Sequence, residues 1–193
     1  MKAAVRPRAL PACFLPLFLV AAILLWGIAP LRAASYAIFL KATGVEGESM
    51  DVNHKGWSDA MAFQHGHVLD AAAQNPVPQF QDLVVYKMLD KASAALQLLC
   101  AAGTRLPELN LDIAQVGDNK LVIYQIRLLE VAVTSYSLTG DAVNGGVRPT
   151  EVVRFAFRHI AWKYTPIGAN GAPEGNICGF YDLLKGAGGT TCF

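Results

Sequence analysis

Alternating apolar and polar positions dominate the chain from residue 36 onward and predict β-strands. Tyr36, Ile38 and Leu40 fall on one face of an extended segment, and the residues between them fall on the other. This two-residue period is typical of a strand. Comparable segments follow at 60–68, 81–88, 109–113, 120–137 and 151–164. The pattern therefore predicts about six strands.

One segment has a helical period instead. Leu96, Leu99 and Cys100 fall on a single stripe when the chain is wound as an α-helix. Asp90 is placed to cap the start of this helix, and Gly103 is placed to end it. We expect one α-helix, inserted midway between the strands, and Cys100 as a small buried apolar residue.

Glycine-rich segments separate or follow these elements. Residues 117–119 predict a tight turn between two strands, and residues 140–148 predict a glycine-rich loop. Residues 166–193 are also rich in glycine, and we expect an irregular C-terminal tail there. Because closing a sheet removes its exposed edges, the predicted fold is mainly β (α+β): a small closed barrel of about six to eight strands with one inserted helix.

The first 33 residues have the composition of a secretory signal peptide. Lys2, Arg6 and Arg8 precede the apolar run 10–28, and small residues follow it. Cleavage after Ala33 would release a periplasmic or secreted protein. The alternative is an uncleaved membrane anchor through residues 10–28, which are nearly long enough to span a bilayer.

Removal of residues 1–33 changes the charge balance. The remaining chain has 12 basic and 15 acidic residues, a net charge of about −3. A protein with no excess of basic residues is a poor partner for nucleic acid. The released chain is not expected to bind a membrane either.

Two cysteines lie close together in the C-terminal tail. A disulfide between Cys178 and Cys192 would close a loop of about 15 residues and contribute at most about 3 kcal/mol by chain entropy. An oxidising compartment would permit this bond. The pair is therefore a candidate disulfide.

Two patterns could carry chemistry. His65 and His67 share one strand face at a metal-ligand spacing, but no third ligand is evident. Ser49 and His54, with Asp51 or Asp59, contain the residue types of a hydrolase triad, which only geometry defines. Residues 47–51 are not the glycine-serine-glycine elbow of such enzymes. We therefore assign no catalytic, cofactor-binding or metal-binding residue.

Five blocks of the sequence occur in an order that resembles a known family. These blocks are "IFLKATGVEGESMDVNHKGW", "QDLVVYKMLDKASAALQLLCAAG", "LNLDI", "VIYQIRLLEVAVTSYS" and "EVVRFAFRHIAWKY". They resemble the Hcp family, the haemolysin-coregulated proteins that form the inner tube of type VI secretion systems. The resemblance covers roughly residues 36–165 and predicts an Hcp-like barrel domain over 34–165.

The resemblance implies a structural function. Hcp proteins are small barrels with one flanking helix that form six-membered rings, and the rings stack head to tail around a central pore. For this chain the resemblance implies a homo-hexamer that contacts secretion-system components and carries effectors in its pore. It also implies a protein that is not an enzyme and needs no cofactor. Ordinary tube subunits have no signal peptide, however. The alternative is therefore a Sec-exported Hcp-like protein that binds a partner or cargo without building the tube.

The loop "GVEGESMDVNHKGW", residues 44–57, matches a segment that the resemblance places in contacts between rings. Its candidate contact residues are Glu46, Gly47, Glu48, Ser49, Asp51 and His54. Substitution of Gly47 or Asp51 is expected to weaken stacking and leave the fold intact.

Overall fold

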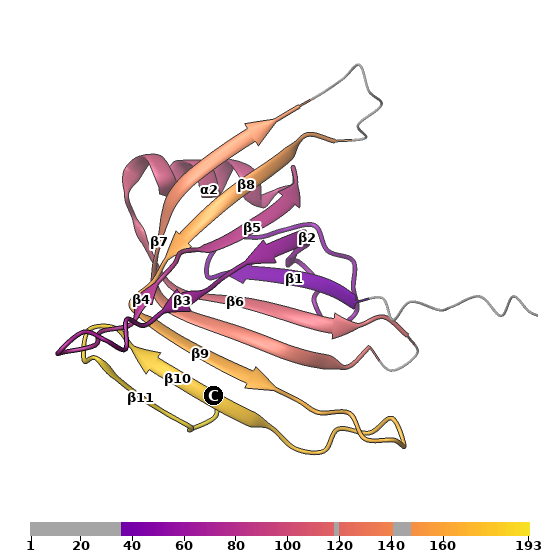
Figure 1. Ribbon diagram of the computed structural model, residues 1–193. Coiled ribbons are helices and arrows are strands. Elements are labelled where there is room, and N and C mark those ends of the chain that lie inside the picture. Colours follow the sequence, from indigo (N-terminus) through magenta and orange to yellow (C-terminus); the bar gives the residue numbers. More distant parts are fainter. Residues whose placement is uncertain (1–35, 118–119, 141–147) are drawn as a thin grey trace, which may run out of the picture. The chain divides into compact units, whose positions relative to one another are not determined.

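The computed structural model describes residues 36–117, 120–140 and 148–193 (Figure 1). These residues belong to one compact unit, 34–193. The predicted signal peptide or anchor, part of the turn at 117–119 and most of the loop at 140–148 lie outside the described residues. Within the described ranges, no helix is long and apolar enough to cross a membrane.

Six antiparallel strands close into a barrel (Figure 1). Their order around the barrel is β7-β6-β1-β2-β5-β8, and β8 pairs back with β7. This closure confirms the predicted fold. Each of the six strands has a neighbouring strand on both sides, so none is an edge strand of the barrel. Their bounds are β1 Tyr36–Ala42, β2 Ser58–Gln64, β5 Leu83–Met88, β6 Arg105–Gln115, β7 Val122–Thr139 and β8 Thr150–Ala156.

Three further strands extend the sheet beyond the barrel, and we call them the wing. They are β9 His159–Tyr164, β10 Ile177–Asp182 and β11 Ala187–Gly189. The first half of the long strand β7 pairs with β9, and its second half pairs with β8. Glu130, at the junction of the two halves, has a positive φ of 51°.

The structure corrects two predictions in this region. The single strand expected over 151–164 is two strands, because the chain leaves one half of β7 at Phe157 and joins the other half at His159. The tail expected to be irregular contains β10 and β11, and β10 pairs with β9 along all six of its residues. Backbone pairing with an available edge outweighs the low strand propensity of a glycine-rich segment.

The strand expected over 60–68 is also interrupted. β2 ends at Gln64, and a separate two-stranded sheet follows, made of β3 His67–Val68 and β4 Gln79–Phe80. At the break, the carbonyl of Gly66 accepts a hydrogen bond from the N–H of Gln81 at 2.9 Å.

Part of the core is a set of apolar rows that run across the sheet from β1 to β10. β5, β8 and the inserted helix contribute further buried apolar residues. Strand register aligns three rows, each with one residue from β1, β6, β7, β9 and β10. The inner two rows are largely buried at β6 and β7. The rows are Ala42, Leu109, Leu128, Ile160 and Tyr181; Leu40, Leu111, Ile126, Trp162 and Gly179; and Ile38, Ile113, Tyr124, Tyr164 and Ile177.

The helix α2, Ala92–Ala102, packs against β7 (Figure 1). The Asp90 carboxylate accepts the N–H of Ala92 at 2.9 Å, and the Ser93 hydroxyl accepts the N–H of Asp90 at 2.9 Å. Gly103 ends the helix in the left-handed conformation, with φ 64°. The Gly103 signal is confirmed. Asp90 contacts the first turn as expected, but the N-cap position itself is occupied by Lys91. Cys100 is only half-buried, but it packs against the core.

A buried ion pair links β5 to β8. Lys87 and Glu151 face each other in register and are both 0% exposed. Lys87 Nζ lies 2.6 Å from Glu151 Oε1 and 2.7 Å from Asp90 Oδ1. The Tyr136 hydroxyl donates to Glu151 as well. This network therefore connects β5, β8, β7 and the start of α2.

Candidate functional site

The loop 43–57 folds back on itself between β1 and β2. The N–H of Gly47 donates to the carbonyl of Gly56 at 2.9 Å, and the N–H of Ser49 donates to that of Trp57 at 2.8 Å. In return, the N–H of Gly56 donates to the carbonyl of Ser49 at 3.1 Å. The two sides of the loop are therefore paired like the arms of a hairpin.

Gly47 is at the closest point between these arms. A Cβ atom there would lie 2.3 Å from the carbonyl oxygen of Trp57, far inside van der Waals contact. Because the obstacle is backbone, it cannot turn aside as a side chain could. The structure therefore contradicts the expectation that substitution of Gly47 leaves the fold intact.

His54 anchors the loop to the barrel. Its side chain is buried and its ring stacks on Phe39, with 4.0 Å between the ring centroids. Nδ1 lies 3.0 Å from Asp51 Oδ1, and Nε2 lies 3.1 Å from Asp112 Oδ2 on β6. Each ring nitrogen thus has a carboxylate partner, one in the loop and one on the barrel.

Asp51 connects this anchor to Lys120, just before β7 begins at Val122. Lys120 Nζ lies 2.8 Å from Asp51 Oδ2, and the N–H of Asn53 donates to Oδ1 at 2.9 Å. The hydrogen bond from Lys120, followed by that from His54, holds the pKa of the Asp51 carboxyl far below its usual range. The carboxylate therefore stays charged at any ordinary pH.

The geometry does not assemble the hydrolase triad considered from the sequence. Both ring nitrogens of His54 face carboxylates, so neither remains to take a proton from Ser49. The Ser49 hydroxyl instead accepts the N–H of Asp51 at 3.3 Å. Ser49 and His54 are buried parts of the loop's own framework.

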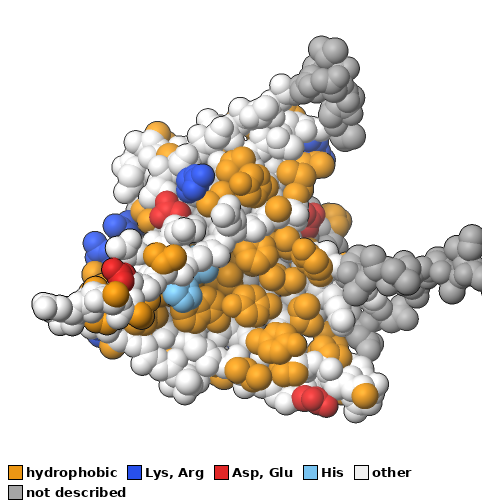
Figure 2. Space-filling model, in the orientation of Figure 1, with side chains coloured by type: hydrophobic (Ala, Val, Ile, Leu, Met, Phe, Trp, Pro, Cys, Tyr) orange, Lys and Arg blue, Asp and Glu red, His pale blue; other side chains and the backbone are white. Residues whose placement is uncertain are grey.

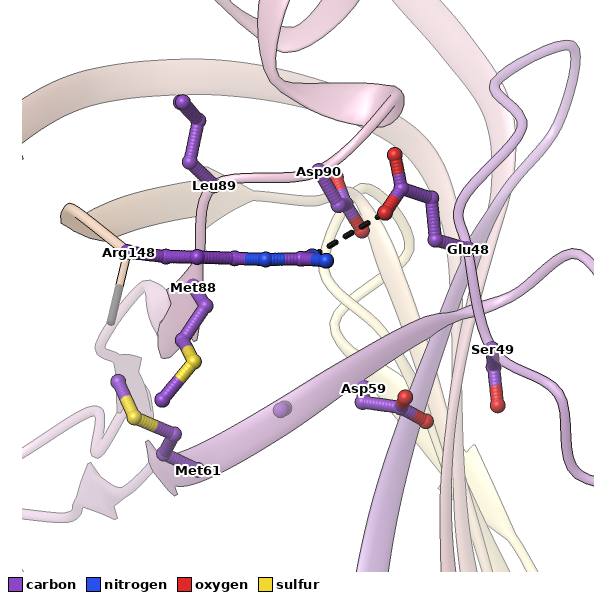
Figure 3. A pocket seen from close by; sticks show the side chains of 9 residues that line it. Glu48, Ser49, Asp59, Met61, Met88, Leu89, Asp90 and Arg148 are labelled. Atoms are coloured by element: carbon purple, nitrogen blue, oxygen red, sulfur yellow. Dashed lines mark hydrogen bonds and ion pairs between the residues drawn. The ribbon is translucent and has the colours of Figure 1, made fainter.

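Glu46 and Glu48 are the exposed members of the candidate set. Glu48 Oε2 lies 3.1 Å from the Arg148 guanidinium (Figure 3). This ion pair spans an open hollow of about 400 Å³ between the loop, β2 and the start of α2. Met61 and Met88 lie together on one side of the hollow, and Asp59 lies below Glu48 (Figure 3). The hollow is therefore lined by charged side chains of both signs, with an apolar side at the two methionines.

The histidines at 65 and 67 lie among aromatic side chains. The His67 ring stacks on Phe80 with 4.8 Å between centroids, and the His65 ring meets Phe157 edge-on at 5.6 Å. Burial lowers the pKa of His65, and the nearby His67 lowers it further. Within the part of the chain that the structure describes, no group of three His, Cys, Asp or Glu side chains is arranged to hold a metal ion.

Three partners of the loop were missed from the sequence: Asp112, Lys120 and Arg148. Each is distant along the chain, by 58 residues between His54 and Asp112 and by 69 between Asp51 and Lys120. One signal was present, since Asp112 is a charged residue between the apolar Leu111 and Ile113.

Comparison with known proteins places this barrel and loop among type VI secretion proteins. The family described as "Type VI secretion system effector, Hcp" matches residues 39–164, which is more than half of the chain. The chain belongs to the Hcp family. The residues that carried the resemblance in the sequence lie almost entirely within the matched range.

Individual relatives agree. "Protein hcp1" of Pseudomonas aeruginosa is 33% identical over 145 residues, which is 72% of this chain and 88% of that protein. A solved type six secretion system protein has a TM-score of 0.74 at 28% identity, over 80% of this chain and 100% of its own. Hcp1 from Salmonella typhimurium has a TM-score of 0.66 at 27% identity, over 79% and 97%.

Proposed function

We propose that this chain is a structural subunit that assembles into homo-hexameric rings, which stack into a tube and carry effectors in the pore. The observation that carries the proposal is the match to Hcp through the whole barrel, together with complete coverage of a solved type six secretion system protein. In this role the protein works by assembly and is not an enzyme.

The exposed apolar face of the wing supports self-association. Figure 2 shows hydrophobic side chains gathered across the face of the sheet presented in that view. The outermost core row continues onto the wing, where Tyr164 is 46% and Ile177 is 64% exposed. With Tyr124, Trp162 and other residues they line an open hollow of about 430 Å³. A large exposed apolar patch is typical of a protein interface.

A ring needs a contact between two different surfaces. In a cyclic hexamer each subunit presents one surface to the neighbour ahead and another to the neighbour behind. We propose the wing face as one of these surfaces. The exposed Glu46 and Glu48 of the loop, with the rim around Arg148, remain candidates for contacts between stacked rings.

The test is the assembly state of the purified protein. Light scattering coupled to size exclusion should give the mass of six subunits, and negative-stain microscopy should show rings. A monomer at all concentrations tested, with no rings on the grid, would contradict the proposal.

A second function is favoured by the Cys178–Cys192 disulfide, since a stable disulfide requires an oxidising compartment. Under this alternative the chain is exported through its N-terminal segment and binds a partner or cargo without building a tube. N-terminal sequencing of protein from the periplasm and medium tests export, because cleavage would expose an N-terminus near Ala34. Protein found only in the cytoplasm and beginning at Met1 would exclude it.

A further inference from the structure

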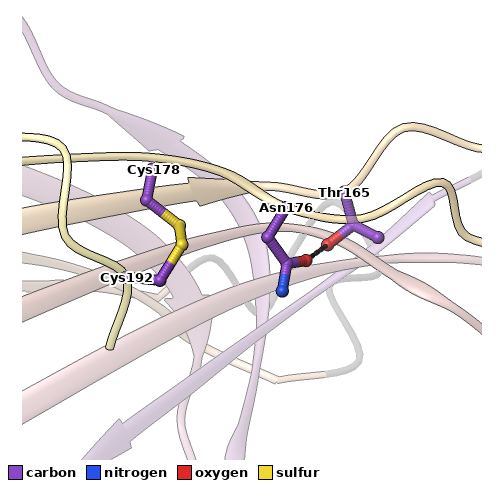
Figure 4. The surroundings of a disulfide bond; sticks show 4 residues. All are labelled: Thr165, Asn176, Cys178 and Cys192. Atoms are coloured by element: carbon purple, nitrogen blue, oxygen red, sulfur yellow. Dashed lines mark hydrogen bonds between the residues drawn. A yellow bond between two sulfur atoms is a disulfide. The ribbon is translucent and has the colours of Figure 1, made fainter.

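Residues 187–193 form a strap along the outer edge of β10. β11, the first part of the strap, pairs with β10 through three residue pairs. The segment that follows reaches Cys192, which is bonded to Cys178 on β10 (Figure 4). It ends at Phe193. β11 is the outermost strand of the nine-stranded sheet.

The strap has little packing of its own. All three residues of β11 are exposed, and two are glycines. A Cβ at Gly188 would lie 2.6 Å from the carbonyl oxygen of Phe180, and one at Gly189 would lie 2.7 Å from the Phe180 ring. The strand thus lies flat against β10 without side chains to hold it. A segment with few apolar contacts and exposed backbone hydrogen bonds opens easily.

Two contacts fix the far end of the strap. The disulfide brings the Cα atoms of Cys178 and Cys192 to 5.1 Å. Next to it, the Phe193 ring lies 5.0 Å from Lys163 Nζ and 5.7 Å from Arg127 Cζ, within the range of cation–π attraction. Arg127 also donates to Glu108 at 2.6 Å, so its guanidinium is held in place for this contact.

We propose that the Cys178–Cys192 disulfide is a redox latch. When it is closed, the strap covers the edge of β10 and the cations of Arg127 and Lys163. When it is reduced, the strap detaches and exposes both. This inference goes beyond the proposed function and does not depend on ring formation, because each contact lies within one subunit.

The opening reaction is a thiol–disulfide exchange with a dithiol. A thiolate of the dithiol attacks one sulfur of the pair and forms a mixed disulfide, and the other cysteine leaves as a thiolate that takes up a proton. The second thiol of the reductant then displaces the remaining cysteine. Both cysteines end as thiols, and the dithiol ends as a disulfide. Cys192 is exposed, so a reductant can reach it.

The edge exposed by opening is reactive toward other strands. Phe180, Tyr181 and Asp182 of β10 pair with β11 on this side, and an uncovered edge offers unpaired N–H and C=O groups to any extended chain. Because disulfides persist in oxidising compartments and are reduced in reducing ones, the latch would be closed in the first and open in the second.

Hydrogen exchange measured by mass spectrometry tests the latch on the purified full chain. In the oxidised protein, peptides covering 187–189 and 180–182, which pair with each other, should be protected. Addition of dithiothreitol should increase their exchange rates by about tenfold or more, as expected for a local opening. Peptides from β6 should not change. Unchanged exchange at the strap after complete reduction, or equal loss of protection in β6, would overturn the proposal.

Matched variants separate the latch from other thiols. Cys100→Ser removes a free cysteine outside the wing, and this variant should respond to dithiothreitol as the natural protein does. Cys178→Ser/Cys192→Ser should show the open strap without any reductant. If that double variant fails to fold, carboxypeptidase digestion of the natural protein gives the second measurement. Release of Phe193 should be faster after reduction, and equal rates in both states would refute the latch.

Discussion

At Gly47 and His54, single residues determine the shape of the loop after β1. Gly47 allows the arms of the loop to approach, and His54 joins them to β6 through Asp112. Both residues are buried. They hold the loop in place and are not accessible to a partner protein, whereas Glu46 and Glu48 are exposed. Among the six candidate residues, the buried ones hold the shape of the loop, and the exposed ones are accessible for contact with another protein.

Gly47→Ala should destabilise the fold by about 1–3 kcal/mol, the usual cost of forcing an extra group into a packed site. The reason is the 2.3 Å approach of a Cβ to the Trp57 carbonyl oxygen. Urea unfolding followed by circular dichroism measures the change. Gly117→Ala is the control, because a Cβ there meets nothing within 4 Å. Equal midpoints for the two variants would show that the loop yields at no cost.

Asp51 should make the free energy of unfolding fall as the pH is lowered into the acid range. Folding lowers its pKa from an unfolded value of about 3.9, so the unfolded chain takes up the proton first as pH falls. The contribution is complete above pH about 4 to 5 and declines below it. Asp51→Asn should therefore flatten the fall in unfolding midpoint between about pH 5 and pH 2. Asp59→Asn, which removes an exposed carboxylate nearby, is the control, and an equal effect of both changes would contradict this role.

At the scale of elements, long-range pairing decides where strands begin and end. β7 pairs with β6 along one edge, and its other edge is divided between β8 and β9, which explains why one alternating segment becomes two strands at Phe157. β5 and β8 are joined by backbone pairing and by the Lys87–Glu151 pair. The same lysine contacts Asp90, which accepts a hydrogen bond from the first turn of α2. The start of α2 and the β5–β8 strand pair are therefore joined by one polar network.

Lys87→Met should cost about 3–5 kcal/mol, because it leaves a buried carboxylate without its cation. Glu151 is fully buried, so water cannot take the place of Lys87. The free energy of unfolding in urea measures the loss. Lys185→Met is the matched control, since that lysine is 78% exposed in its ion pair with Asp182 and should change stability by less than about 1 kcal/mol. Similar losses would mean that the buried pair contributes no more than a surface one.

At the scale of the whole molecule, the barrel leaves an apolar face uncovered on the wing. The core rows are largely buried where they cross the barrel strands. In the outermost row, Tyr164 and Ile177 on the wing are exposed to solvent. Membership of the Hcp family and this exposed face both favour assembly. The strap and its disulfide lie on the outer edge of the same wing.

Ile177→Lys should abolish or strongly weaken assembly, because it places a charge in the apolar patch of the wing. Stability should change by less than about 0.5 kcal/mol, as is usual for exposed positions. Light scattering gives the mass, and urea unfolding gives the stability. Leu184→Lys is the control, being 66% exposed but in the turn before β11. Assembly that survives Ile177→Lys would remove the wing face from the proposed ring contact.

The sequence by itself determined the strand-rich barrel class, the single helix with its Asp90 and Gly103 signals, and the Hcp family. These rest on local periods, caps and the order of sequence blocks, all of which are visible along the chain. Only the tertiary structure decided the partition of β7 between two strands, the addition of β10 and β11 to the sheet, and partners such as Asp112 for His54. The physical reason is that register across strands brings together residues 58 or more positions apart, and no local pattern encodes such a distance. Burial of Gly47 and His54 follows from the same pairing, so their supporting role could not be separated in the sequence from the exposed role of Glu46 and Glu48.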